Sequence, residues 1–342
     1  MLDPARLAEA FVLGQPQGPL ALVPGAWSNR LWRLETEQGR FAVKELLGPA
    51  AAGEWPHRLQ VAMTVERAAW TAGTIPMAEP MTAVGSGGWL AEVATTTGQR
   101  ATVRCHRWVP GTPATAVAPS PAMAADVGRS LAAIHALGLT APETTATGLV
   151  PLSLATWHQT VTQTRRAGLP WARDLAGLTP LVEQLAERLQ ALQGQGRPMV
   201  LSHRDLDPKN AVVRPDLRVA LLDWDYAGPT LAGSEMLVTA LSFAGGTLQP
   251  DAACVGACVR GFLDAGGQVQ PPDLLDTAVI HQESLSWLWL NVDRCLGRRL
   301  RDPADHQLGQ RLASQLLGAF AAEVATVDRW AGRLLEQPGP SA

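Results

Sequence analysis

Clusters of basic residues and long apolar runs are both missing from this 342-residue sequence. Its 28 lysines and arginines, set against 31 acidic residues, form no basic stripe that would suit a nucleic acid or an anionic membrane. No run of 18 apolar residues is present to span a bilayer, and the start, MLDPARLAEAF, lacks the basic and apolar regions of a signal peptide. We therefore expect a cytoplasmic protein with no nucleic-acid and no membrane partner. The sequence leaves the oligomeric state open.

Cysteine is also scarce, with four residues, which is not the pattern of a disulfide framework in a chain of this length. Cys254 and Cys258 lie four residues apart in a predicted helix, but no His or Cys follows at the spacing of metal ligands. We interpret them as packing residues. His135, on the apolar face of the helix LAAIHAL, is interpreted as a core histidine in the same way.

Two common nucleotide-binding motifs are absent, because neither G-x-x-x-x-G-K-[ST] nor G-x-G-x-x-G occurs. This excludes P-loop and Rossmann sites. Lysine occurs only twice, at Lys44 and Lys209, while arginine fills every other basic position. The lysine ammonium is a compact point charge that can enter a narrow phosphate site, where the wide arginine fork fits less well. Each lysine therefore marks a candidate phosphate contact.

Hydrophobic residues make up 46% of the chain and charged residues 17%, so it can bury a large core. A short helix is predicted from Asp3-Pro4 to Gly14, followed by the strand-like runs LALVPG, RLWRLET and RFAVKEL. The stretch 73–90 and the run ATVRCHRWV suggest two more strands. Between these two groups of strands, residues 57–72 have helical spacing. One face of that helix carries Leu59, Met63, Glu66 and Trp70.

The character of the chain changes near Pro110. A connector rich in Pro, Thr and Ala covers 109–122, and the rest is predicted to be helical except for 198–225. We expect an α+β fold with a strand-rich lobe of residues 1–108 and a larger helical lobe of residues 109–342. Two lobes of this kind leave a cleft, where ligands commonly bind.

The strongest functional pattern is LSHRDLDPKNAVV at 201–213, followed by VALLDWD at 219–225. His203, Asp205 and Asn210 form an H-x-D-x-x-x-x-N pattern, and Asp223 follows 18 residues after Asp205. Phosphoryl transfer needs a carboxylate near the attacking hydroxyl and oxygen ligands for Mg²⁺. A pair of aspartates and an asparagine at the ends of adjacent strands would meet that need.

These segments resemble the catalytic and metal-binding segments of the aminoglycoside phosphotransferase and choline-kinase-like family, a branch of the protein-kinase-like fold. The resemblance implies a small-molecule phosphotransferase that uses ATP and Mg²⁺. It implies that Asp205 orients or deprotonates the acceptor hydroxyl, that His203 braces the loop, and that Asn210 and Asp223 hold Mg²⁺. The alternative, that these residues only cap loops, is weakened because crowded carboxylates repel one another without a cation.

A second constellation is the pair of Lys44, in the strand FAVKEL, and Glu66, on the apolar face of the next helix. A carboxylate on an apolar face is costly to bury unless it is paired, and a lysine from the neighbouring strand would pair it. In the kinase-like fold such a pair positions the α- and β-phosphates. We expect a Lys44–Glu66 ion pair. Taken alone, these two residues would be explained better as an ordinary strand lysine beside a glutamate at the helix edge, but beside the H-x-D-x-x-x-x-N segment the ion pair is favoured.

The remaining nucleotide contacts are predicted from position. The turn Pro24-Gly25-Ala26-Trp27-Ser28-Asn29 stands where the resembled family often has a short phosphate-binding turn, so Gly25, Ser28 and Asn29 are candidates; a plain hairpin turn explains them equally well. Adenine is expected at the lobe connector, near Trp108 and Val109, through main-chain groups. The choice between ATP and GTP stays open.

The acceptor is expected to lie against the helical lobe, opposite the catalytic aspartate. Candidate residues, each of which is explained at least as well as part of a solvated helix face, are Asp207, Asp225, Glu235, Glu283, Trp287 and Asp293. If they face the cleft, the pocket suits a cationic small molecule such as an amino sugar, a basic peptide or an amino alcohol. The resembled families accept aminoglycosides, other antibiotics, choline-like alcohols and sugars, so antibiotic resistance is one possible role.

Three other classes of protein fit the sequence less well. A protein kinase is disfavoured because Asp223 is followed by Trp224-Asp225 rather than by Phe-Gly, and too few residues follow for an activation loop. A catalytically silent nucleotide-binding module is disfavoured by the complete set of Lys44, Glu66, Asp205, Asn210 and Asp223. A purely structural helical protein would not explain acids placed at strand ends.

Overall fold

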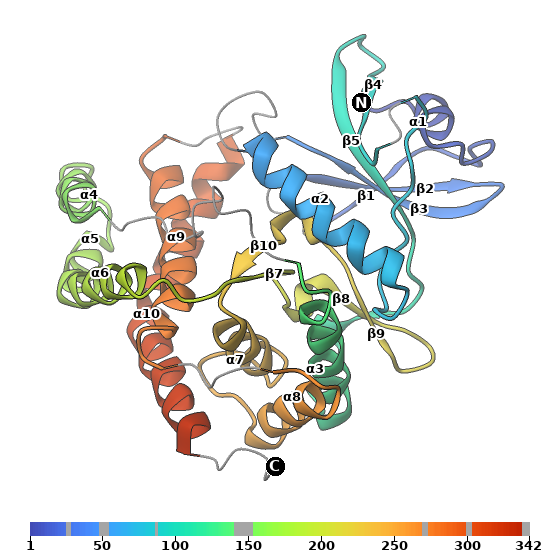
Figure 1. Ribbon diagram of the computed structural model, residues 1–342. Coiled ribbons are helices and arrows are strands. Elements are labelled where there is room, and N and C mark those ends of the chain that lie inside the picture. The colour runs from blue at the N-terminus through green and yellow to red at the C-terminus, as the bar shows by residue number, and fades with distance from the viewer. Residues whose placement is uncertain are drawn as a thin grey trace. The chain divides into compact units, whose positions relative to one another are not determined.

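The computed structural model describes residues 1–24, 29–47, 55–85, 88–139, 153–268, 273–298 and 303–336 (Figure 1). The chain divides into two compact units. One unit comprises Met1–Ala118 and Ser202–Gly228, and the other comprises Pro119–Leu201 and Pro229–Ala342. The division into lobes of 1–108 and 109–342 stays a prediction. The contacts group Ser202–Gly228, which holds both candidate catalytic segments, with the N-terminal strands.

The first unit is built on a five-stranded antiparallel sheet with the strand order β1-β2-β3-β5-β4. Its strands and helices are α1 (Pro4–Phe11), β1 (Ala21–Val23), β2 (Arg30–Thr36), β3 (Gly39–Glu45), α2 (Trp55–Ala72), β4 (Ala91–Ala94) and β5 (Arg100–Arg107). Asp3 starts α1 by accepting a hydrogen bond from the Ala5 N–H at 2.9 Å, and Pro4 occupies the first helical position, where no N–H is needed. The apolar side of α1 packs on the sheet through Leu7 and Phe11.

Helix α2 places a carboxylate inside this unit. Leu59, Met63 and Glu66 are buried, as the helical spacing predicted, and Glu66 is 0% exposed. Trp70, which was expected on the same face, is 40% exposed. The helix packs against the short 3-10 helix η3 (Trp224–Tyr226). This contact brings Glu66 close to Asp223-Trp224-Asp225, the DWD segment.

A small three-stranded sheet carries the candidate catalytic segments, with the order β6-β8-β9. The elements of this region are β6 (Thr112–Pro113), η1 (Ala114–Ala116), β7 (Val200–Ser202), η2 (Pro208–Asn210), β8 (Ala211–Val213), β9 (Val219–Leu221), η3 and β10 (Gly228–Thr230). Strands β8 and β9 form a hairpin in which Ala211 pairs with Leu221. The residues just before β8 and just after β9 are therefore neighbours at one end of the hairpin.

The second unit is helical. Its helices are α3 (Pro121–His135), α4 (Leu154–Arg166), α5 (Ala172–Gly177), α6 (Thr179–Gly194), α7 (Ala232–Ser242), α8 (Ala252–Asp264), α9 (Thr277–Cys295) and α10 (Pro303–Glu336). Helix α3 packs most extensively on α8, and α10 on α9. Trp157, Leu285 and Phe320 belong to its main apolar core. No helix in the described ranges is both long enough and apolar enough to cross a membrane.

The sequence predicted this α+β architecture, and the helix at 57–72 and the first three strands are confirmed with ends shifted by a few residues. Of the two strands suggested for 73–90 and ATVRCHRWV, the second is β5. The first lies later than expected, at Ala91–Ala94. Pro and Gly are frequent in 73–90, and its described residues make only isolated bridges, such as that between Pro80 and His106.

Candidate active site

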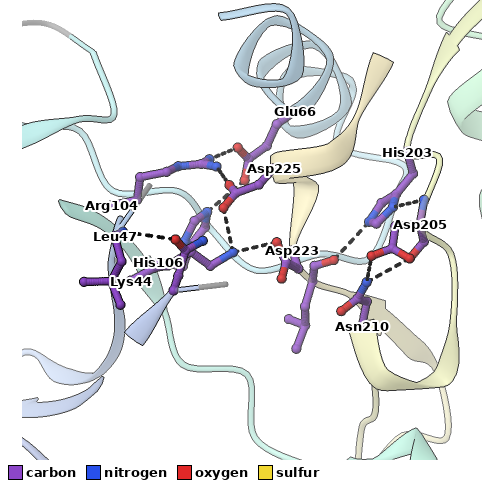
Figure 2. A network of polar contacts seen from close by, with 12 residues as sticks. Lys44, Leu47, Glu66, Arg104, His106, His203, Asp205, Asn210, Asp223 and Asp225 are labelled. Atoms are coloured by element: carbon purple, nitrogen blue, oxygen red, sulfur yellow. Dashed lines mark hydrogen bonds and ion pairs between the residues drawn. The ribbon is translucent and has the colours of Figure 1, made fainter. Parts of the chain in front are cut away.

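The candidate catalytic loop between β7 and β8 is fixed by His203, which is fully buried. Its Nε2 lies 2.9 Å from the Leu222 carbonyl oxygen, which can only accept, so Nε2 carries the proton. Its Nδ1 accepts a hydrogen bond from the Asp205 N–H at 3.4 Å (Figure 2). The centre of its ring lies 4.6 Å from that of Trp224. His203 thereby ties the loop before Asp205 to the end of β9.

Both oxygens of the Asp205 carboxylate are held by donors. Asn210 donates from Nδ2 to Oδ2 of Asp205 at 2.7 Å and to the Asp205 main-chain oxygen at 2.9 Å (Figure 2). Lys209 donates from Nζ to Oδ1 at 2.7 Å. Burial lowers the pKa of Lys209, but Asp205 and Asp207 outweigh burial, and the pKa is raised. The carboxylate is thus oriented by one neutral and one charged side chain.

Two non-glycine residues in these loops have left-handed backbone conformations. Arg204, which precedes Asp205, has φ 64°, and Asp223 itself has φ 57°. Such conformations are uncommon outside glycine and are often found at functional sites. Both turn the chain sharply, just before Asp205 in one case and just after β9 in the other.

Lys44 on β3 joins the DWD segment to the sheet. Its Nζ donates to Oδ1 of Asp223 at 2.5 Å and to Oδ2 of Asp225 at 2.9 Å (Figure 2). Burial lowers the pKa of Lys44, but the carboxylates of Asp225 and Asp223 outweigh burial and raise it. For Asp225, burial raises the pKa, but the charges of Lys44 and Arg104 hold it well below its usual range. Both groups therefore stay charged near neutral pH.

The expected Lys44–Glu66 ion pair is corrected by the structure. Glu66 accepts from Nη2 of Arg104 and lies 2.8 Å from Nε2 of His106, while Nη1 of Arg104 donates to Asp225 (Figure 2). Arg104 lies directly opposite Lys44 in the pairing of β3 with β5 and is 1% exposed. The arginine fork has separate donors for two carboxylates, so it bridges Glu66 and Asp225, and Lys44 binds the two aspartates.

The expectation that a buried Glu66 needs a cationic partner is confirmed, with a different partner. Burial raises the pKa of Glu66, but Arg104 and His106 outweigh burial, and the pKa is lowered. Sequence reasoning missed Arg104 and His106. The signal was their spacing, since residues two apart in the strand ATVRCHRWV point to the same face as each other.

The other predicted nucleotide contacts are described only in part. Gly25 and Ser28 lie outside the described residues. Asn29 accepts a hydrogen bond at Oδ1 from the Leu47 N–H at 3.3 Å, which links the ends of β2 and β3. Trp108 and Val109 are half-buried, and the Trp108 N–H donates to the Arg40 carbonyl at 2.9 Å. That N–H is therefore engaged in the sheet.

Several acceptor candidates have structural partners. Asp207 caps η2 by accepting from the Lys209 N–H at 2.9 Å, and Asp225 is held by Lys44 and Arg104. Glu235 is 2% exposed and lies 2.8 Å from Nε2 of His135, which agrees with the interpretation of His135 as a core histidine.

The remaining acceptor candidates lie on α9 of the helical unit. Glu283 and Trp287 are half-buried, and the Trp287 ring lies 5.8 Å from the Arg294 guanidinium. Asp293 is buried and accepts from Arg298 at 3.0 Å. Their role in binding an acceptor stays a prediction. Among the described residues, no group of three or more His, Cys, Asp and Glu side chains is arranged to hold a metal ion.

Comparison with known proteins assigns the chain to a family. The model of the phosphotransferase enzyme family matches residues 20–272, a range that includes the whole polar network. A search of curated protein sequences gave no match. Among solved structures, an aminoglycoside phosphotransferase from Alicyclobacillus acidocaldarius is similar, with a TM-score of 0.56 and 16% identity over 97% of both chains.

Two further structures have the same fold. The amicoumacin kinase hAmiN, in complex with AMP-PNP and Ca²⁺, has a TM-score of 0.60 and 14% identity over 91% of both chains. A microcompartment-associated aminopropanol kinase has a TM-score of 0.60 and 16% identity, covering 97% of this chain and 98% of that one. At these identities the likeness shows the fold alone.

Proposed function

Because the chain belongs to the phosphotransferase enzyme family and has its kinase-like fold, we propose that it transfers the γ-phosphoryl group of ATP to a hydroxyl group of a small molecule. The observation that carries this proposal is the geometry of Asp205. Its carboxylate is oriented by Asn210 and Lys209 and lies in the same compact unit as the Lys44–Asp223 pair. One unit thus contains both the group for the acceptor and the groups for the nucleotide.

The residues for the nucleotide and Mg²⁺ have suitable chemistry. Mg²⁺ prefers oxygen ligands and is commonly held by one or two carboxylates together with substrate phosphates and water. Asp223 supplies a half-exposed carboxylate, and Asn210 uses Nδ2 rather than Oδ1 for its bonds to Asp205. We assign Mg²⁺ to these two oxygens, where it would neutralise the phosphate charge. Lys44, 2.5 Å from Asp223, is within reach of phosphates bound at that site.

In the proposed reaction Asp205 orients the acceptor hydroxyl and takes its proton. The hydroxyl oxygen forms a bond to the γ-phosphorus, the bond from that phosphorus to the bridging oxygen breaks, and the electron pair stays on ADP. His203 acts through the loop, because its two ring nitrogens fix the main chain on both sides of the site. A second role for His203 in proton transfer is not needed.

For the acceptor we propose a cationic small molecule. The similar structures named for aminoglycosides, amicoumacin and aminopropanol support this class, although their acceptors differ. Glu283 and Trp287 remain candidate contacts.

The test is an ADP-release assay with Mg-ATP and a panel of aminoglycosides, peptide antibiotics, choline, ethanolamine and amino sugars. Asp205→Asn is expected to lower turnover by roughly 10² or more, as for removal of a general base. The matched control is Asp264→Asn, at the exposed end of α8. Turnover that survives in Asp205→Asn would contradict the assignment of Asp205. Binding of Mg-ATP without turnover on any acceptor would favour a catalytically silent module.

A further inference from the structure

Lys209 orients Asp205 but has no part in the phosphoryl transfer step described above. Its ammonium group lies 2.7 Å from Oδ1 of Asp205, the oxygen that Asn210 does not engage. The Lys209 side chain is 47% exposed and that of Asp205 is 35% exposed. A ligand that reaches Asp205 from solvent therefore meets the ammonium group at the same place.

The fold presents Lys209 at this position through the turn η2. Asp207 accepts from the Lys209 N–H at 2.9 Å, and its carbonyl accepts from the Asn210 N–H at 2.9 Å. The capped turn directs two consecutive side chains to the two oxygens of one carboxylate. The Asn210 side chain is buried, whereas the Lys209 side chain lies on the solvent side.

A role in stability does not account for this arrangement. Ion pairs between exposed side chains contribute little to the free energy of unfolding. Asn210 already holds the other carboxylate oxygen of Asp205 and its main-chain oxygen. A charged donor on the remaining oxygen also competes with the acceptor hydroxyl for that oxygen, which would hinder catalysis unless the charge served the reaction.

We propose that Lys209 is a further catalytic residue, whose ammonium group contacts the γ-phosphoryl group during its transfer. This rests on the function proposed above. The phosphoryl group passes between ADP and the acceptor oxygen held by Asp205, so its oxygens come close to the Asp205 carboxylate. A fixed positive charge there offsets the repulsion between carboxylate and phosphate and stabilises the charge that spreads over the phosphoryl oxygens. Lys209 keeps its proton throughout, and the acceptor proton goes to Asp205.

The residue type supports this assignment. Only two of the 28 basic residues are lysines, and both contact carboxylates of this site. A compact ammonium group fits between a carboxylate and a phosphoryl group more readily than a planar guanidinium does.

The two lysines also permit a direct test that does not depend on turnover. Growth on ¹³C,¹⁵N-lysine labels Lys44 and Lys209 alone, and Lys44→Arg and Lys209→Arg assign the two sets of signals. We expect both lysine signals to shift with Mg-AMP-PNP. With Mg-ADP, which lacks the γ-phosphate, we expect the Lys44 signal to shift and the Lys209 signal to shift much less.

Each outcome bears on the proposal. If the Lys44 signal shifts but the Lys209 signal does not, Lys209 does not sense the γ-phosphate and the proposal is wrong. The proposal is also wrong if the Lys209 signal shifts by the same amount with Mg-ADP and with Mg-AMP-PNP. If neither signal shifts with either nucleotide, the proposed function itself fails. In the assay, Lys209→Met should lower kcat by roughly 10² with a small change in the KM for ATP, and Lys209→Arg should retain part of the activity. Full activity in Lys209→Met would also overturn the proposal.

Discussion

Arg104 is the residue on which the buried charges of the first unit depend. It and Lys44 are like charges directly opposite each other on neighbouring strands, an arrangement that is normally unfavourable. Here Glu66 binds one end of the pair, Asp223 binds the other, and Asp225 lies between the two cations. The charges therefore alternate from helix α2 to the candidate metal ligand, and each depends on its neighbours.

We predict that Arg104→Met destabilises the protein by about 3–5 kcal/mol, because it leaves the fully buried Glu66 with a much weaker partner. Urea unfolding of the variant measures the loss. Arg100→Met is the control, since Arg100 lies on the same strand with a side chain 72% exposed, and it should change stability by about 0.5 kcal/mol at most. Adding Glu66→Gln to Arg104→Met should restore part of the stability. If Arg104→Met were as stable as Arg100→Met, the buried Arg104–Glu66 pair would not be needed for stability.

At the scale of elements, the close crossing of α3 and α8 depends on two glycines. A Cβ atom on Gly128 would lie 2.1 Å from the Cys258 carbonyl oxygen, and one on Gly261 would lie 2.3 Å from the Ala125 carbonyl oxygen. Both obstacles are main-chain atoms, so no change of rotamer can relieve them. The main chains of the two helices are therefore in contact at both points, and the helices must separate if either residue gains a side chain.

We expect Gly261→Ala to lower the free energy of unfolding by about 1–3 kcal/mol, as overpacking does in other cores. The matched control is Gly318→Ala in α10, where no atom lies within 4 Å of the added Cβ. Because alanine favours a helix over glycine, this change should raise stability by about 1 kcal/mol at most. Thermal unfolding of both variants measures the contrast. A stabilised Gly261→Ala would mean that the two helices are further apart than described.

At the scale of the whole molecule, a single charged residue that joins several helices makes stability depend on pH. Asp328 on α10 joins three helices of the second unit. It accepts hydrogen bonds from Thr277 and Arg188, each at 2.8 Å, and lies 2.8 Å from Nε2 of His281. Although burial raises the pKa of Asp328, His281, Arg188 and Thr277 hold it at about 2, below its usual 3.8.

This lowered pKa predicts how stability depends on pH. A carboxyl group with a lower pKa in the folded state stabilises the protein fully above its unfolded pKa of 3.8, and the stabilisation is lost as the pH falls toward 2. The contribution is about 2 kcal/mol. We therefore expect Asp328→Asn to be less stable than the wild type at pH 5 but to lose less stability as the pH falls to 2, roughly the range in which such a group titrates. Urea unfolding of both proteins at several pH values between 5 and 2 measures this difference. Parallel curves for the two proteins would contradict the prediction.

Much of this protein was determined by local sequence. Alternating apolar residues predicted β2 and β3, and helical spacing predicted α2. The H-x-D-x-x-x-x-N pattern with a later Asp pointed to the candidate catalytic segments. These features were predictable because each depends on residues a few positions apart, whose periodicity or spacing shows directly in the sequence.

The tertiary structure alone decided which charges pair. Spacing showed that Glu66 is buried and needs a cation, but Lys44 and Arg104 lie on adjacent strands and are both candidates. The register of β3 with β5 and the packing of α2 on η3 place the Arg104 fork between Glu66 and Asp225, and Lys44 between the aspartates. Such pairing depends on distances between segments up to 181 positions apart, which no local pattern in one sequence specifies.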